Sequence, residues 1–386
     1  MSGTDRVDWI CLSADDYWNS NPHSRYHIAK EFSKHGKVLW VNSIGHRFPS
    51  IKRRKGWQLI FRKIKSYLIF FRKAETYFYV VSPLTIPVFR GAFVRRLNVL
   101  LLWWQIKFTA KIAGIRGRNY FISSPSFGIL AEKLANAMVV YYYSDLYTVF
   151  RELKYKQEVE VLDRKLFSAA SLVYGASEEI CSRVSTTEKR AKYLPHAVDV
   201  NHFARTGETP LSMEGIPSPV IGYYGTITDS NDWEIIEYCA KERPSYHFVF
   251  IGKKFISLPH LESLPNIHFI DKVSYNDIPL YGQSFDVAIM FWVLRDWIKN
   301  SNPLKLLEYF ALGKPVVSVD IPEVRKRFGD IVSIAANKEE FLQHIDSALR
   351  CDRMQLRRVY EQVLQNYSWT NVASEIYADM KGTGRV

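Results

Sequence analysis

Two short stretches of the 386-residue sequence combine residue types that could bind an anion and move a proton. In SNPLKLLEYFALGKPVVSVD, residues 301–320, Asn302 and Pro303 suit the start of a helix on which Lys305 and Glu308 would lie on nearby turns. The unpaired N–H groups of a helix start favour a diphosphate, and a lysine cation would add to that attraction. Glu308 could accept hydrogen bonds from a ribose diol. An ordinary helix with an exposed Lys and Glu explains the same spacing equally well.

The second stretch is VVYYYSDLYTVF, residues 139–150, where an apolar strand pattern ends in Ser144 and Asp145. A carboxylate is costly to bury alone, so Asp145 must be solvated, paired or in use. At the carboxyl end of a strand it could act as a general base. It could equally cap a helix that follows, and one residue could do both.

Other polar residues are weaker candidates for contact with a substrate. Asp16, His23 and Arg25 lie in the stretch that follows the first expected strand, and Ser177 and Glu178 follow a later one. Such residues are more often polar surface. No pair of aspartates with the D-x-D spacing of a metal site appears in a candidate loop, so we expect no metal and no cofactor.

The four cysteines are far apart and form no C-x-x-C pair, which argues against a disulfide framework or a zinc site. A reducing cytosol fits this usage best. The first residues, MSGTDRVDWICLS, lack a basic region followed by a long apolar core, so no signal peptide is expected.

The elements that must position these residues alternate along the chain, which predicts parallel sheets covered on both faces. Apolar runs at 7–13, 37–43, 76–82, 119–124, 138–145 and 171–177 indicate strands, and the periodicity of 25–36, 126–136 and 159–170 indicates helices. A stretch rich in Gly, Pro, Ser and Thr then interrupts the alternation, which restarts near residue 220. We therefore expect an α/β protein with domains at 1–205 and 219–366, a linker at 206–218, and a C-terminal helix within 367–386 that packs back on the first domain.

The net charge of +13 is concentrated in one segment. Residues 47–118 contain seventeen Lys or Arg and one acidic residue, Glu75. The stretch WQLIFRKIKSYLIFFRK, residues 57–73, has apolar residues at helical spacing among cations, the pattern of a helix on an anionic lipid surface. The residues expected to contact the membrane are Trp57, Arg62, Lys63, Lys65, Phe71, Trp103 and Trp104.

Two other interpretations of these charges are a helix packed on its own domain and a nucleic-acid-binding surface. An amphipathic helix packed on its own domain, with solvated lysines, would show the same pattern. Nucleic acid would use the same cations, but no motif that reads bases accompanies them, so no nucleic-acid partner is expected. The apolar stretches at residues 57–73 and 93–108 both fall short of the roughly 18 uninterrupted apolar residues that a membrane span needs.

The helix stretch NPLKLLEYFALGKPVVS resembles the nucleotide-sugar helix of GT-B glycosyltransferases, whose fold is two Rossmann-like domains facing a cleft. IGYYGTI, LPNIHFIDKVSYNDIP and SWTNVASEIY match the same pattern, so the resemblance covers nearly the whole chain. It implies a UDP-linked or similar sugar donor on the second domain, an acceptor on the first, and catalysis without a metal. The implied nucleotide-sugar-binding residues are Gly225, Thr226, Ile227, Lys253, Val273, Asn302, Leu304, Lys305 and Glu308.

The chain departs from the family-4 pattern of these enzymes at three positions. Asn300 stands where the first of two glutamates is usual, and Thr226 and Asn231 stand where an arginine and a lysine are usual. Two cations that would neutralise a diphosphate are thus missing. Lys305, with Lys253 and the helix start, would have to do more of that work.

A closer likeness in layout is to the membrane-associated glucuronosyltransferases of xanthan assembly, through YYYSDL and PLKLLEY. It implies an inverting transfer with Asp145 as general base, and a donor such as UDP-glucuronate. The acceptor would be a lipid-linked saccharide at the cytoplasmic face of the inner membrane. Two alternatives remain: a retaining family-4-type enzyme, and a non-catalytic relative that only binds membrane or polysaccharide.

Overall fold

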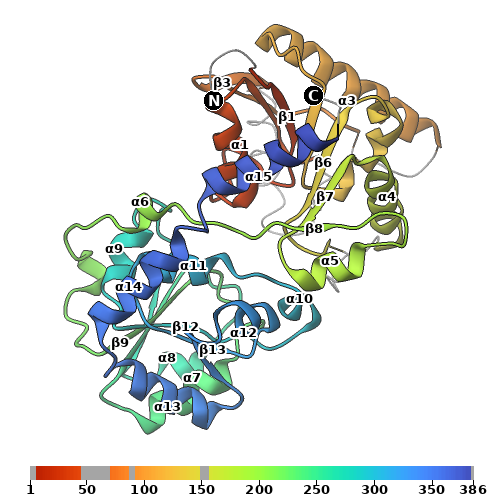
Figure 1. Ribbon diagram of the computed structural model, residues 1–386. Coiled ribbons are helices and arrows are strands. Elements are labelled where there is room, and N and C mark those ends of the chain that lie inside the picture. Colours follow the sequence, from red (N-terminus) through yellow and green to blue (C-terminus); the bar gives the residue numbers. More distant parts are fainter. Residues whose placement is uncertain (1–5, 45–69, 87–91, 148–155, 384–386) are drawn as a thin grey trace. The chain divides into compact units, whose positions relative to one another are not determined.

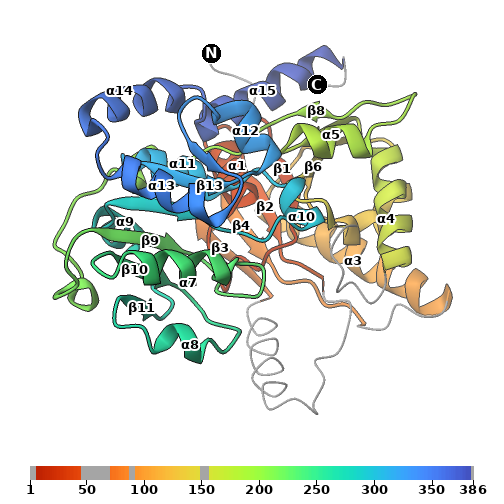
Figure 2. The same ribbon diagram turned by 90° about the horizontal axis from the view of Figure 1, so that it is seen from below.

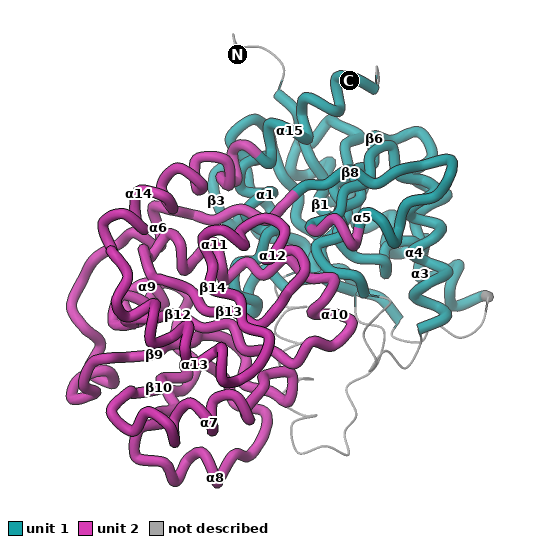
Figure 3. Tube along the Cα trace, turned by 60° about the horizontal axis from the view of Figure 1, so that its bottom comes forward, with its two compact units in different colours: residues 1–176, 181–194, 372–386 teal, residues 177–180, 195–371 magenta. Residues whose placement is uncertain are grey.

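The computed structural model describes residues 6–44, 70–86, 92–147 and 156–383. The chain divides into two compact units (Figure 3). The first unit comprises residues 1–176, 181–194 and 372–386, and the second comprises residues 177–180 and 195–371. Each unit is built on its own sheet.

The first unit has an eight-stranded sheet in the order β3-β4-β2-β1-β5-β6-β7-β8. Every pair in it is parallel except β3 and β4, which run antiparallel. Its strands are β1 (Trp9–Leu12), β2 (Val38–Val41), β3 (Phe71–Glu75), β4 (Phe78–Val81), β5 (Asn119–Ile122), β6 (Met138–Tyr143), β7 (Leu172–Gly175) and β8 (Lys192–Tyr193).

Helices cover both faces of this sheet (Figures 1 and 2), because successive strand side chains point to opposite faces. On one face Phe121 meets Phe32 of a helix, and on the other Tyr120 stacks near Trp103 of another. The helices with residues in this unit are α1 (Ser24–Ser33), α3 (Ala92–Ala113), η1 (Pro125–Leu134, a 3-10 helix), α4 (Lys156–Ala169), α5 (Glu178–Val184) and α15 (Trp369–Gly382).

The C-terminal part of α15, from Val372 on, belongs to the first unit although it is far away in sequence. The Trp9 indole donates a hydrogen bond of 3.1 Å to the Tyr377 hydroxyl. Asp379 accepts hydrogen bonds of 2.6 Å from the Tyr174 hydroxyl and from the Lys192 ammonium. The end of the chain thus packs on strands β1, β7 and β8.

The second unit has a six-stranded parallel sheet in the order β11-β10-β9-β12-β13-β14. In Figure 1, α7, α8 and α13 lie on one face of this sheet and α9, α11 and α14 on the other. Its strands are β9 (Val220–Tyr224), β10 (His247–Ile251), β11 (Ile267–Ile270), β12 (Val287–Met290), β13 (Val316–Val319) and β14 (Ser333–Ala335).

The helices of the second unit are mostly short amphipathic crossovers between strands. The longer ones, α7, α13 and α14, begin at side-chain caps, Asp232, Asn337 and Asp352. The helices are α6 (Val200–Phe203), η3 (Leu211–Met213), α7 (Trp233–Glu242), α8 (Pro259–Glu262), α9 (Ile278–Gln283), α10 (Asp296–Lys299), α11 (Leu304–Ala311), α12 (Pro322–Phe328), α13 (Lys338–Ala348) and α14 (Arg353–Leu364).

The predicted α/β class, with two Rossmann-like sheets, is confirmed. One local prediction is wrong: Phe71 was expected on a helix over 57–73, but it lies in strand β3, where its ring stacks on Tyr79 of β4 with centroids 6.0 Å apart. Antiparallel pairing of Phe71 with Val81, ten residues along the chain, favours a hairpin over the helical pattern. The expected linker, residues 206–218, falls inside the second unit. Over the described residues, no helix has the length and apolar character that crossing a bilayer demands.

Candidate functional site

Asp145 follows β6, the most continuously buried strand of the first unit. All six residues of β6 are buried between β5 and β7, and the chain turns directly after Tyr143. Ser144 is buried and its hydroxyl donates a hydrogen bond of 3.3 Å to the Asp145 carboxylate. Asp145 as a whole residue is half-buried at the end of this strand.

A buried cation shares this end of the sheet with Asp145. Arg25, at the start of α1, lies 2.8 Å from the Asp15 carboxylate and donates a hydrogen bond to the Tyr147 hydroxyl. The side chains of Arg25 and Asp15 are 9% and 17% exposed, so this ion pair is largely shielded from water. We call Asp15, Arg25, Asp145 and Tyr147 the Asp145 cluster.

Electrostatics within the Asp145 cluster set the charge of the candidate base. Burial raises the pKa of the Asp145 carboxyl above its usual value, the charge of Arg25 and the hydrogen bond from Ser144 lower it, and the charge of Asp15 raises it. Arg25, expected to touch acceptor or diphosphate, contacts the Asp15 carboxylate and the Tyr147 hydroxyl in the structure. It acts on its neighbours through charge.

Asp16 and His23, the other candidates from this loop, are held by local turns. Asp16 accepts hydrogen bonds of 3.0 Å from the Trp18 amide and the Asn19 side chain. The carbonyl of His23 accepts from the Tyr26 amide at 2.9 Å, at the start of α1. A cavity of about 170 Å³ opens beside them, and its lining is Asp15, Asp16, Tyr17, Ser20, Asn21, Pro22, Tyr26 and Trp40.

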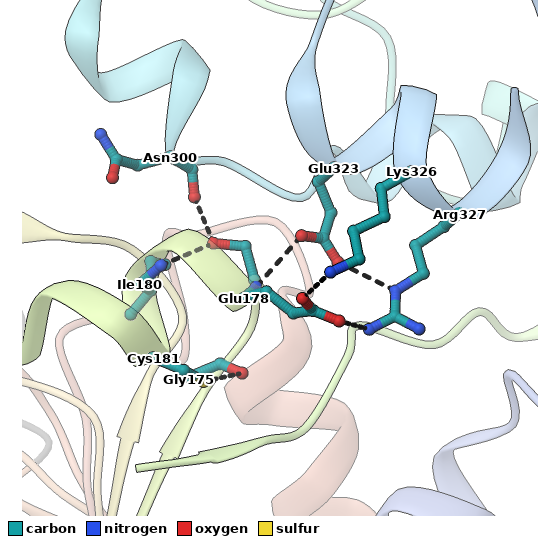
Figure 4. Close-up of polar contacts among 9 residues, drawn as sticks. Gly175, Glu178, Ile180, Cys181, Asn300, Glu323, Lys326 and Arg327 are labelled. Atoms are coloured by element: carbon teal, nitrogen blue, oxygen red, sulfur yellow. Dashed lines mark hydrogen bonds and ion pairs between the residues drawn. The ribbon is translucent and has the colours of Figure 1, made fainter. Parts of the chain in front are cut away.

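Ser177 and Glu178, expected near an acceptor, are tied to the second unit's own residues (Figure 4). The fully buried Ser177 hydroxyl donates to the Asn300 carbonyl at 2.6 Å and accepts from the Ile180 amide at 3.1 Å. The Glu178 carboxylate accepts from Lys326 and Arg327, and the hydrogen bond from Lys326 chiefly lowers its pKa. These contacts use the polar groups of both residues structurally.

In the second unit a tight glycine turn follows β9. Gly225 has φ +151° and donates its amide to the Ile251 carbonyl at 2.8 Å. A Cβ added to Gly225 would lie 2.6 Å from Cε of Lys305, and one on Gly252 would lie 1.9 Å from the Gly225 carbonyl oxygen. Only glycine permits both close approaches. They bring the predicted residues Gly225 and Lys305 together.

Lys305 projects from the first turn of α11 against aromatic rings. Its ammonium lies 5.8 Å from the Tyr223 ring centroid and 5.7 Å from that of Trp292. Glu308, one turn further on, is 7% exposed; burial raises the pKa of its carboxyl, while the charge of Lys305 and the nearby Tyr224 side chain lower it. We call Tyr223, Gly225, Trp292, Lys305 and Glu308 the Lys305 cluster.

The start of α11 differs by one residue from the expectation. Asn302 was expected to cap the helix, but Pro303 occupies the cap position, and Asn302 is buried just before it. Proline has no side chain that can accept from the first-turn amides, so Pro303 itself does not cap them. The first-turn amides carry a partial positive charge that attracts an anion.

Most of the remaining predicted donor residues follow β9, β10 or β11 in the chain, and Leu304 is the first residue of α11. Ile227 is fully buried, with its amide donating to the Lys253 carbonyl at 3.1 Å; the Lys253 ammonium itself lies 5.2 Å from the Phe255 ring. Thr226 is exposed, and Leu304 and Val273 are half-buried. Asn231 is buried in a turn, where its side chain accepts from the Thr228 amide at 3.1 Å.

Sequence reasoning missed the aromatic part of the Lys305 cluster. Tyr223, Tyr224 and Trp292 end or follow strands β9 and β12 and looked like ordinary core positions. The runs GYYG and MFWV were the available signal, because bulky rings at two neighbouring strand ends can enclose a side chain from the next helix.

The predicted membrane residues divide into two groups. Trp57, Arg62, Lys63 and Lys65 lie outside the described residues. Trp103 is half-buried against Tyr120, whereas Trp104 on the same helix is 60% exposed. Among the described residues, no group of three or more His, Cys, Asp or Glu side chains is placed to hold a metal ion.

Residues 218–351, within the second unit, match the family described as Glycosyl transferases group 1. Over 220 residues the chain is 24% identical to TuaH of Bacillus subtilis (strain 168), named as a teichuronic acid biosynthesis glycosyltransferase. That match covers 52% of this chain and 55% of TuaH, so the chain spans about half the length of this curated relative.

Solved structures match over nearly the full length. Sucrose-phosphate synthase from Thermosynechococcus elongatus has a TM-score of 0.69 at 11% identity, covering 98% of this chain and 99% of that one. A glycosyltransferase from Rickettsia africae gives 0.67 at 15%, covering 98% and 99%. HepE of Anabaena in complex with UDP gives 0.66 at 12%, covering 97% and 100%. The closer likeness to the xanthan-pathway glucuronosyltransferases stays a prediction. These solved structures show a GT-B fold, and residues 218–351 match the group 1 glycosyl transferases.

Proposed function

We propose that this protein is a glycosyltransferase that moves a sugar from a nucleotide-sugar donor, UDP-linked, to a saccharide acceptor in the assembly of a bacterial surface polysaccharide. The observation that carries the proposal is the family match over residues 218–351, which contain the whole Lys305 cluster. The name of TuaH, a teichuronic acid biosynthesis glycosyltransferase, supports a polysaccharide product. The HepE structure with bound UDP supports a UDP-linked donor.

The Lys305 cluster would hold the donor. The Gly225 turn has no side chain to obstruct a diphosphate, and the ammonium of Lys305 and the first-turn amides of α11 would both favour its negative charge. As the sugar bond breaks, charge grows on the departing diphosphate, so these groups would stabilise the transition state more than the ground state. The carboxylate of Glu308 would accept hydrogen bonds from the ribose. No metal cofactor is part of this proposal.

Asp145 would act as the general base of an inverting transfer. Its carboxylate would take the proton of an acceptor hydroxyl while that oxygen attacks the anomeric carbon. The bond from this carbon to the diphosphate oxygen would break, and the nucleoside diphosphate would leave with the electron pair. We choose Asp145 as the base because of its position: it lies just after the buried strand β6, and the residue is only half-buried.

The acceptor would be a lipid-linked saccharide at the cytoplasmic face of the inner membrane. The proposed membrane location is supported by the charge of residues 47–118. This segment contains seventeen Lys or Arg and one acidic residue, so it would be attracted to an anionic membrane surface. A donor such as UDP-glucuronate belongs to the same proposal.

Replacing the proposed base should lower turnover, whereas replacing the cation proposed to bind the diphosphate should weaken donor binding. With membrane extract as acceptor and a panel of sugar nucleotides as donors, Asp145→Asn should lower turnover by about 10²- to 10⁴-fold and leave the dissociation constant of the donor unchanged. Lys305→Ala should chiefly weaken donor binding, measured by calorimetry with UDP. NMR of the product's anomeric proton gives the stereochemistry.

Three outcomes would contradict parts of this proposal. Normal turnover by Asp145→Asn would remove the base, and a retained anomeric configuration would favour the retaining family-4-type enzyme instead. The absence of turnover of every donor by the native protein, with UDP binding also absent, would favour a non-catalytic relative that binds membrane or polysaccharide.

A further inference from the structure

The outer face of α3 exposes an unusual amount of apolar surface. Six large apolar side chains on this one helix are between 37% and 78% exposed: Phe93, Leu100, Leu101, Trp104, Phe108 and Ile112. Single exposed apolar residues are common, but a continuous set marks an interaction surface. We call these six residues the α3 stripe.

The α3 stripe is continuous because its members follow one another at helical spacing. From Phe93 to Ile112 most of the steps are three or four residues once the half-buried Leu97 is included, which confines the stripe to roughly a third of the helix circumference. The Trp104 and Phe108 rings stack with centroids 5.1 Å apart and planes inclined by 8°. Figure 1 shows α3 along the outside of the first unit.

Hydrogen bonds of two buried amide side chains next to the α3 stripe fix the rotation of α3. The Asn98 side chain accepts from the Ile86 amide and donates to the Ile86 carbonyl, both at 2.8 Å. The Gln105 side chain makes the same pair with Leu84, at 2.8 and 2.9 Å. Turning the α3 stripe inward would break four hydrogen bonds of nearly buried amides, so its exposure is a stable property of the fold.

The charges on α3 identify the partner. The helix carries Arg95, Arg96, Lys107 and Lys111 and has no acidic residue. All four cations are exposed, and the Lys107 ammonium lies 5.6 Å from the Trp103 ring centroid. A second copy of this face would bring like charges together. An anionic lipid surface instead offers phosphates for the cations and an acyl region for the apolar side chains.

We propose that α3 lies in the plane of an anionic bilayer surface and inserts the α3 stripe below the lipid phosphates. This inference deepens the proposed function by naming the element that holds the enzyme near a lipid-linked acceptor, yet lipid binding can be measured without activity. Apolar insertion also differs from attraction by basic residues alone, because salt screens charges but not the burial of Trp104 and Phe108.

The test uses the full-length protein and vesicles of phosphatidylglycerol and phosphatidylcholine in equal parts. The double variant Trp104→Ser/Phe108→Ser should sediment with vesicles at least about tenfold more weakly than the native protein, since two large side chains lose their burial. The matched control Leu211→Ser/Met354→Ser removes two apolar side chains that are 83% and 72% exposed elsewhere, and it should bind as the native protein does. Circular dichroism verifies that both variants are folded.

Several results would overturn the inference. Undiminished binding by the Trp104/Phe108 variant would show that the α3 stripe does not insert, as would native binding that high salt abolishes entirely. A native dimer that this variant dissociates in light scattering without lipid would make a second copy the partner. The Asp145→Asn variant should bind vesicles normally, so failure of the proposed reaction and failure of lipid insertion give separate results.

Discussion

Arg25 and Asp15 act in opposite directions on the candidate base. The Arg25 charge lowers the pKa of Asp145, and the Asp15 charge raises it. Because a general base works only when ionised, the acid limb of the pH dependence of kcat/KM reports this pKa in the free enzyme. Arg25 is therefore a positioning residue in the proposed reaction, and its contribution has a measurable sign.

Arg25→Gln should move the acid limb of kcat/KM to higher pH. Without the cation the ionised carboxylate loses a stabilising neighbour, so its pKa rises. At a fixed pH below the limb, activity should fall about tenfold for each unit by which this pKa rises. Asp15→Asn is the matched control, because it removes a negative neighbour and should move the limb to lower pH. Shifts of both variants in the same direction, or none, would refute this account.

At the residue scale the sequence located Asp145 and Lys305 but not the partners that set their properties. Asp145 could be found because a buried strand ended in a carboxylate. The ion pair of Arg25 with Asp15, and the rings around Lys305, depend on which loops and strands become neighbours. Ser177 and Glu178 show the reverse case: they looked available, and contacts distant in sequence use their polar groups.

At the scale of elements, the turn after β9 connects the sheet with the lysine of α11. Gly225 has φ +151° and leaves no room for a Cβ beside Lys305. Gly215 also has a positive φ, +81°, but nothing lies within 4 Å of an added Cβ. A substitution at either glycine would strain the backbone, but only a substitution at Gly225 would also clash with Lys305 of the candidate site.

Gly225→Ala should weaken UDP binding, measured by calorimetry, by at least about tenfold, because the new methyl group displaces Lys305 and strains the turn. Gly215→Ala should lose about 1 kcal/mol of unfolding free energy through strain alone and keep its affinity for UDP. Equal affinities for UDP in both variants would mean that the Gly225 turn does not position Lys305 for the donor.

Elements were predictable where their patterns are local. The strands of apolar and β-branched residues, and helices such as α7 with its Asp232 cap, follow from spacing alone. The stretch at Phe71 was mistaken for helix because its apolar residues fit both periods until pairing with β4 decided between them. The helix boundary at Pro303 moved by one residue for a similarly local reason.

At the scale of the whole molecule, the proposed function assigns donor and base to different units. Gly225, Lys305 and Glu308 belong to the second unit, and Asp145 and Arg25 belong to the first. The sequence predicted this assignment because two alternations of strands and helices are separated along the chain. The sequence also predicted a C-terminal helix that packs back on the first domain, but it did not identify the contacts of Tyr377 and Asp379 with distant strands that dock this helix.

Hydrogen exchange of the full-length protein with UDP tests this assignment. At a concentration about a hundred times the dissociation constant, UDP should stabilise the part that binds it by about 2.7 kcal/mol. We expect slower exchange in peptides that contain Gly225 and the first turn of α11, and unchanged exchange in peptides of β6 and α1. Lys305→Ala at the same UDP concentration should lose this protection, whereas Asp145→Asn should keep it. Protection that appears first around Asp145 in the absence of an acceptor would place the nucleotide on the wrong unit and contradict the assignment.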